Sequence, residues 1–173
     1  ATVDECNRMI ADPYPRLLVA RDQVNQGAAL VLMSVAAARR FGVPEANWVY
    51  LHGHADLVEQ QLLDRRQLDV SHAATGAVTE ALRVAGIGLA DIATFDLYSC
   101  FPYPVFVVCD AFGLASDDPR GLTLTGGLPY FGGYSARAYC LRWPAAAMAA
   151  PKACSAPIYC GHASKAAHTR WPG

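Results

Sequence analysis

The chain has 173 residues, of which 53% are hydrophobic and 17% are charged, and its formal net charge is −1. This length and apolar content are typical of one globular domain with a sizeable core, not of a disordered segment. The near-neutral charge argues against nucleic acid or an anionic membrane as a partner. The longest apolar stretches, residues 27–33 and 104–109, are far shorter than the roughly 20 residues of a membrane-spanning helix.

The first third of the chain predicts a strand, a helix and a second strand. Residues 28–34 (AALVLMS) form a continuous apolar run that is typical of a strand buried on both faces. Residues 35–41 favour a helix that Gly42 and Pro44 would end. Residues 48–55 begin with aromatic and β-branched side chains, which predict the second strand.

The next predicted helix runs from a cap at Ser71 or Thr75 to Val84, with Gly86 as its C-terminal stop. After it, residues 94–98 predict a third strand, residues 105–112 a third helix and residues 122–125 a short fourth strand. Strands that alternate with helices indicate an α/β domain with a largely parallel sheet.

The charge distribution divides the chain near Gly133. Residues 1–133 hold all 15 acidic residues and 9 basic ones, whereas residues 134–173 hold 5 basic residues and no acidic residue. The second stretch is also rich in Ala, Pro and Cys. We therefore expect a core domain over 1–133 and a compositionally divergent segment over 134–173. An altered reading frame or a foreign tail would explain this segment, and a native sequence is the equally weighted alternative.

Four ordered segments resemble the thiolase superfamily, in particular its acetyl-CoA acetyltransferase and lipid-transfer group. Residues 21–34 are similar to the entry into the second half of a thiolase, and residues 72–92 to the helix and turn that follow it. The run DLYSCF at 96–101 stands where thiolases have ELNEAF or ELHDCF, and TGGLPYFGG at 125–133 stands where they have NGGAIALGH.

The resemblance implies an α/β fold in which each half of the protein is a mixed five-stranded sheet with helices on both faces. This chain would be the C-terminal half, and an N-terminal half would carry the nucleophilic Cys that takes the acyl group from an acyl-CoA. Homo-oligomers are usual in the family. No cofactor is expected, because the coenzyme A thioester is itself the substrate.

The resemblance also implies three catalytic residues. Tyr98 occupies the position that holds an oxyanion-site water, and its hydroxyl can donate a hydrogen bond there. Cys100 lies in the same motif, and Cys160 is a poor counterpart of the family's acid or base Cys. Each of the two motif residues also has a purely structural interpretation. Cys100 would then be a small apolar residue of the core, and Tyr98 a packed aromatic residue.

The glycines at 126, 127, 132 and 133 are expected to bind substrate through close approach of the backbone, although ordinary turns explain them equally well. The family's catalytic His is absent, because Gly133 or Arg137 takes its place. A non-catalytic thiolase-fold subunit is therefore one alternative function. A retro-aldolase that uses Tyr98 as its acid or base is another.

Several other residues have simple structural interpretations. His52 and His54 share one face of a predicted strand, and Cys160 with His162 could complete a zinc site, but the usual companion ligands are missing and we predict no metal. Arg65 and Arg66 are expected to form a solvated face. The irregular spacing of the six cysteines favours reduced thiols, and no secretory signal is visible, so we expect a cytoplasmic protein.

Overall fold

A computed structural model describes residues 2–21, 24, 29, 31–124, 126–131, 138–142 and 157–162, the last two ranges by their backbone. Its helices are α1 (Val35–Arg40), α2 (His72–Ala85), α3 (Pro102–Phe112) and α4 (Leu128–Phe131). Four short 3₁₀ helices are η1 (Arg16–Leu18), η2 (Glu45–Asn47), η3 (Leu62–Asp64) and η4 (Leu89–Asp91). None of the helices in these ranges is long and apolar enough to cross a bilayer.

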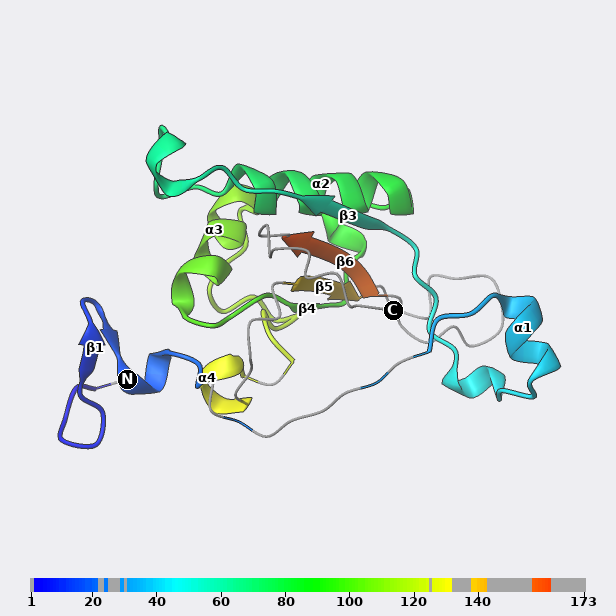
Figure 1. The fold of residues 1–173 in the computed structure, drawn as a ribbon, viewed down its shortest axis with the longest axis horizontal. Helices are drawn as coiled ribbons and strands as arrows, with labels where there is room; N and C mark the ends of the chain where they lie inside the picture. Colours follow the sequence, from blue (N-terminus) through cyan, green and yellow to red (C-terminus); the bar gives the residue numbers. More distant parts are fainter. Residues whose placement is uncertain are drawn as a thin grey trace, which may run out of the picture.

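The main sheet is mixed and has the strand order β3-β6-β5-β4 (Figure 1). Its members are β3 (His54–Leu57), β4 (Thr94–Asp96), β5 (Ala138–Arg142) and β6 (Pro157–His162). Strand β3 is parallel to β6, whereas β5 is antiparallel to both β6 and β4. The predicted α/β class and mixed sheet are therefore observed. The described residues form four strands of this sheet where five were predicted, and the expectation of a largely parallel sheet is wrong.

Strands β5 and β6 come from the segment that the composition sets apart, and they occupy the two central positions of the sheet. Without them β3 and β4 would not belong to one sheet, because β3 pairs with β6 and β4 pairs with β5. The predicted boundary at 133/134 lies in residues 132–137, outside the described part of the chain. The segment after it nevertheless supplies backbone pairing at the centre of the fold.

Helix α2 forms as the sequence predicts. The Ser71 side chain accepts a 3.2 Å hydrogen bond from the backbone N–H of Ala74, which satisfies one of the unpaired donors of the first turn. Gly86 ends the helix with φ at +70°, a left-handed conformation that favours glycine. Between these ends Ala77, Val78 and Ala81 are almost fully buried, and this stripe packs the helix on the sheet.

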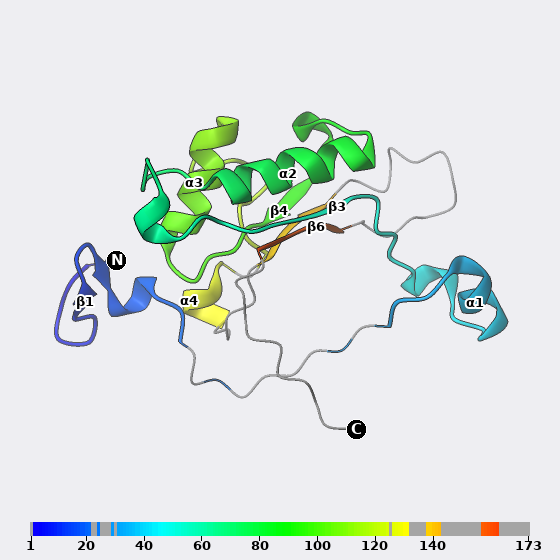
Figure 2. The ribbon, with the colours of Figure 1, turned by 45° about the horizontal axis from the view of Figure 1, so that its top comes forward.

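Helix α3 completes the core on the same side of the sheet. It begins at Pro102, three residues earlier than predicted, because proline is well suited to the first turn of a helix. Its Val108 packs in one cluster with Phe95 and Leu97 of the β4 segment. Helices α2 and α3 lie on one face of the sheet in Figure 2, so the described residues show the two long helices on one face, where helices on both faces were predicted.

The predicted buried strand at 28–34 is not observed over its described part. Residues 31–34 have no regular secondary structure, and the side chains of Val31 and Leu32 are 78% and 80% exposed. A strand buried on both faces needs neighbouring strands to pair with its backbone, and no described residues pair with 31–34. The following helix, α1, is confirmed, and it lies away from the main sheet (Figure 1).

Two other strand predictions are displaced. The strand expected at 48–55 begins only at His54. Residues 122–124 form no strand. Leu122 nevertheless accepts a 2.9 Å hydrogen bond from the N–H of Leu97, so this segment lies beside the residues that follow β4. A separate hairpin near the N-terminus joins β1 (Met9–Ala11) to β2 (Tyr14–Pro15).

Candidate functional site

A pocket of about 320 Å³ lies between the start of α3, the N-terminal end of α2 and the loop that precedes α2. Both apolar and polar side chains line it: Glu59, Arg65, Ser71, Ala74, Tyr98, Cys100, Phe101, Tyr103, Pro104 and Val107. A concave, partly apolar site with a few converging polar groups is the usual form of a small-molecule site. We therefore take this pocket as the candidate site.

Tyr98 and Cys100 reach the pocket because successive side chains after β4 point alternately to the core and to the pocket. Leu97 and Ser99 are buried, whereas Tyr98 and Cys100 are half-buried and line the pocket. The backbone of this segment is fixed on one side by the hydrogen bond from Leu97 to Leu122 and by a 2.7 Å bond from the Ala20 N–H to the Cys100 carbonyl. Two residues singled out by one motif thus meet in one pocket, and their catalytic roles stay predictions.

The loop that contains Gly126 and Gly127 lies against the segment of Tyr98 and Cys100 at Ser99. Gly126 and Gly127 have φ of +79° and +99°, a region that favours glycine. A Cβ at Gly127 would lie 3.3 Å from the Ser99 Oγ, which accepts a 3.0 Å hydrogen bond from the Leu128 N–H. Neither glycine is among the residues that line the pocket, and their proposed contact with substrate stays a prediction. Gly132 and Gly133 lie outside the described residues.

Cys160 lies in β6, where its backbone is opposite Ala55 of β3 and Tyr139 of β5. Its side chain is outside the described part of the structure, so its role as an acid or base stays a prediction. Among the side chains that are described, no group of three or more His, Cys, Asp or Glu residues is arranged to hold a metal ion. His54, one of the two histidines of the suggested zinc site, is exposed in β3.

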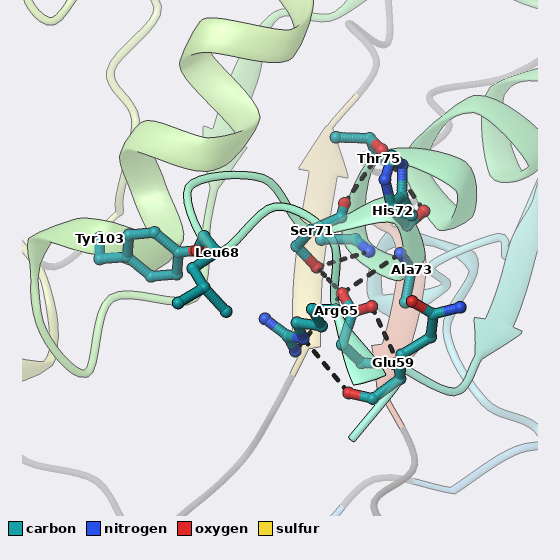
Figure 3. A network of polar contacts seen from close by, with 10 residues as sticks. Glu59, Arg65, Leu68, Ser71, His72, Ala73, Thr75 and Tyr103 are labelled. Atoms are coloured by element: carbon teal, nitrogen blue, oxygen red, sulfur yellow. Dashed lines mark hydrogen bonds and ion pairs between the residues drawn. The ribbon is translucent and has the colours of Figure 1, made fainter. Parts of the chain in front are cut away.

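Glu59, which also lines the pocket, is the centre of a polar network (Figure 3). Its side chain is only 5% exposed. Its carboxylate accepts hydrogen bonds from the Ser71 hydroxyl, from the Gln60 N–H at 3.0 Å and from the Ala73 N–H at 3.4 Å. One guanidinium nitrogen of Arg65 lies 3.7 Å from the same carboxylate.

The network keeps Glu59 ionised. Burial opposes the charged form, but the hydrogen bonds from Ser71 and from the backbone, together with the positive charge of Arg65, outweigh it and lower the pKa of Glu59 below its ordinary value. A buried carboxylate with three donors and a nearby cation therefore remains an anion at neutral pH.

The prediction that Arg65 belongs to a solvated face is wrong. Its side chain is only 20% exposed, and its Nε donates a 3.2 Å hydrogen bond to the Gln60 carbonyl. Arg66 is exposed, as expected. Sequence patterns could not separate the two, because the partners of Arg65 are in an irregular loop that has no periodicity.

Tyr103 joins this loop to helix α3. Its hydroxyl donates a 2.7 Å hydrogen bond to the Leu68 carbonyl. Burial raises the pKa of Tyr103, so its hydroxyl stays protonated and remains a donor over a wide pH range. The segment of Tyr98 and Cys100 and the loop of Glu59 and Arg65 therefore both line the pocket, and the Tyr103 hydrogen bond links this loop to helix α3.

A second cavity, of about 340 Å³, lies between residues 31–35 and 43–50. Its walls are mostly apolar and include the exposed side chains of Val31 and Leu32. None of the predicted catalytic residues lines it. It therefore offers little acid, base or nucleophilic chemistry.

The fold can be compared with that of a solved structure. The chain is similar to the crystal structure of a monomeric SCP2-thiolase-like protein type 1 from Mycobacterium smegmatis, with 69% sequence identity and a TM-score of 0.71. The chain has an SCP2-thiolase-like fold. The match covers 76% of this chain and 29% of the solved protein, so the chain spans less than a third of that relative. No protein-family model matches the chain, and neither does any curated protein.

The comparison supports the thiolase resemblance at the level of the fold. The solved SCP2-thiolase-like protein is described as monomeric, so it lends no support to the predicted homo-oligomer. The pocket residues that sequence patterns do not identify are Glu59, Arg65 and Tyr103. The sequence predicts Ser71 only as a candidate helix cap.

Proposed function

We propose that this chain is the C-terminal part of a thiolase-like acyltransferase that moves acyl groups between coenzyme A thioesters. The observation that carries the proposal is that Tyr98 and Cys100, the two residues of the thiolase-like motif, line one pocket in an SCP2-thiolase-like fold. Under this proposal a nucleophilic Cys comes from an N-terminal half. The pocket of this chain receives the acyl thioester.

The two residues have different roles in this scheme. The Tyr98 hydroxyl donates a hydrogen bond to the thioester oxygen on which negative charge develops. Because Cys100 lines the pocket, we assign to it, and not to Cys160, the role of the family's acid or base Cys: it takes a proton from the α-carbon of the second acyl thioester. The resulting carbanion attacks the carbonyl carbon of the acyl-enzyme, so a carbon–carbon bond forms and the bond to the nucleophilic sulfur breaks.

The chain differs from the family in one respect that matters here. Gly133 or Arg137 stands where the family has a His that activates the nucleophile, and both positions lie outside the described residues. The base that activates the nucleophile must therefore come from another part of the complete enzyme. If no such base exists, the thiolase-fold chain is a non-catalytic subunit.

A retro-aldolase is the second candidate, and the position of Tyr98 in the pocket favours it. In that reaction Tyr98 accepts the proton of a β-hydroxyl group, the carbon–carbon bond breaks, and the thioester fragment takes up a proton. The products are an aldehyde or ketone and a shorter acyl-CoA. Free coenzyme A is not consumed.

Joining the chain to an N-terminal thiolase half that carries the nucleophilic Cys tests these functions. The acyltransferase predicts that a β-ketoacyl-CoA and free coenzyme A give two acyl-CoA products, measured by chromatography. Release of an aldehyde or ketone from a β-hydroxyacyl-CoA would favour the retro-aldolase. A joined, folded protein that binds no acyl-CoA would contradict both enzymes.

A further inference from the structure

We infer that Arg65 binds a carboxylate at the far end of the acyl group, so that the pocket selects short acyl thioesters with a terminal negative charge. The inference deepens the proposed function, on which it rests, by naming the class of acyl group. It starts from a difference between the two charged groups of the pocket. The Glu59 carboxylate accepts three hydrogen bonds from other groups, whereas the terminal nitrogens of Arg65 make no close hydrogen bond to a described residue.

The hydrogen bonds to the Glu59 carboxylate come from groups other than Arg65. It accepts from the Ser71 hydroxyl and from the N–H groups of Gln60 and Ala73, and its side chain is 5% exposed. It needs no donor from Arg65. At 3.7 Å the guanidinium contributes charge attraction to Glu59 without a close hydrogen bond.

The Arg65 guanidinium retains most of its donors. Within the described residues its hydrogen bonding is limited to Nε, which donates to the Gln60 carbonyl. The two terminal nitrogens form the planar fork that matches a carboxylate in a bidentate arrangement. Because Arg65 lines the pocket and its side chain is only 20% exposed, a ligand carboxylate would meet a partly buried guanidinium there, where charge attraction is stronger than in water.

The lining of the pocket brings Arg65 together with the predicted catalytic residues. Arg65 and Glu59 come from the loop that precedes α2, and Tyr98 and Cys100 come from the segment that follows β4. An acyl thioester at Tyr98 and Cys100 and a carboxylate at Arg65 would therefore share one pocket, which Phe101, Pro104 and Val107 also line. A pocket of about 320 Å³ suits a short chain.

The test compares two minimal thioesters that carry no phosphate. The 173-residue chain is titrated calorimetrically with glutaryl-N-acetylcysteamine and with pentanoyl-N-acetylcysteamine, which have the same acyl length. A charge-assisted bidentate pair predicts that the glutaryl thioester binds at least about tenfold more tightly. Arg65→Gln should remove this preference, Arg65→Lys should keep part of it, and Arg66→Gln, in an exposed neighbour, should leave it unchanged.

Each result decides the inference. Equal binding of the two thioesters by the unaltered chain would overturn it and leave the proposed function standing, whereas binding of neither would count against both. A preference that survives Arg65→Gln would overturn the role of Arg65. Should Arg65→Gln fail to fold by circular dichroism, an Arg65→Lys preference equal to that of the unaltered chain would overturn it. Inorganic phosphate that displaces the glutaryl thioester at equal concentration would show a general anion site and contradict selection of a carboxylate.

Discussion

The Ser71 hydroxyl donates a hydrogen bond to the carboxylate of Glu59, which lies twelve residues earlier in the chain. The same Ser71 oxygen accepts from the Ala74 N–H and so caps helix α2. One side chain therefore fixes both the start of the helix and the loop that carries Arg65. The geometry of the pocket depends on this link between a local cap and a contact distant in sequence.

Ser71→Ala should destabilise the protein by about 2 kcal/mol, because it removes a helix cap and leaves the nearly buried Glu59 carboxylate with one donor fewer. Ser34→Ala is the matched control. Ser34 caps α1 with a 3.2 Å bond from Ala37 but holds no loop, so about 0.5–1 kcal/mol is expected. Urea unfolding measures both. Equal losses would mean that the contact with Glu59 adds nothing to stability.

Gly53→Ala should be among the most damaging single changes. A Cβ at Gly53 would lie 2.2 Å from the backbone oxygen of Ala81, so α2 would have to move away from the segment that leads into β3. We expect a loss of about 3 kcal/mol or more. At Gly88 the nearest atom to an added Cβ is the Asp91 Oδ2 at 3.5 Å, an ordinary contact, so Gly88→Ala should be far milder. A tolerated Gly53→Ala in thermal unfolding would contradict the observed packing of α2.

The pair of Asp118 and Arg120 makes stability depend on pH. Two side-chain hydrogen bonds from Arg120, at 2.8 and 2.7 Å, lower the pKa of Asp118 to about 2. A group whose folded pKa is below its unfolded value contributes stability above about pH 4, and this contribution is lost as the pH falls toward 2. The unaltered chain should therefore lose its advantage in Tm over Asp118→Asn between these values. Asp117→Asn, at an exposed neighbouring position, is the matched control substitution.

Alkylation by iodoacetamide should distinguish the thiols of the described residues. Burial, with Asp110 and Asp118 nearby, raises the pKa of Cys109, so it should react at least about tenfold more slowly than the exposed Cys6. Cys100 lines the pocket, and a bound acyl thioester should slow its reaction and leave that of Cys6 unchanged. Mass spectrometry of peptides measures each rate. Protection of Cys6 equal to that of Cys100 would argue against binding in the pocket.

The sequence predicts the elements whose causes are local. Helix α2 has its cap at Ser71, its apolar stripe at Val78 and Ala81 and its stop at Gly86 all within one stretch of chain. The strand expected at 28–34 fails because burial of an apolar run depends on neighbouring strands, and no described strand pairs with its described residues. The central places of β5 and β6 could not be predicted either, since pairing between distant strands leaves no local pattern.

The residues of the candidate site also differ in whether the sequence predicts them. Tyr98 and Cys100 come from a short motif with strand alternation, so the sequence identifies both. The loop of Glu59 and Arg65 depends on contacts between residues that are far apart in the chain, such as Tyr103 with Leu68. An ion pair between Glu59 and Arg65 in an irregular loop cannot be distinguished from two solvated charges until the structure is known.

The central claim is that Tyr98 and Cys100 act in acyl transfer, and kcat of the joined protein tests it most directly. Acid–base and oxyanion contributions predict that Cys100→Ala and Tyr98→Phe each lower kcat by about a hundredfold, whereas Cys6→Ala, in the N-terminal segment, leaves it unchanged. Circular dichroism confirms that each variant is folded. Acyl transfer at an unchanged rate in both pocket variants would contradict the account.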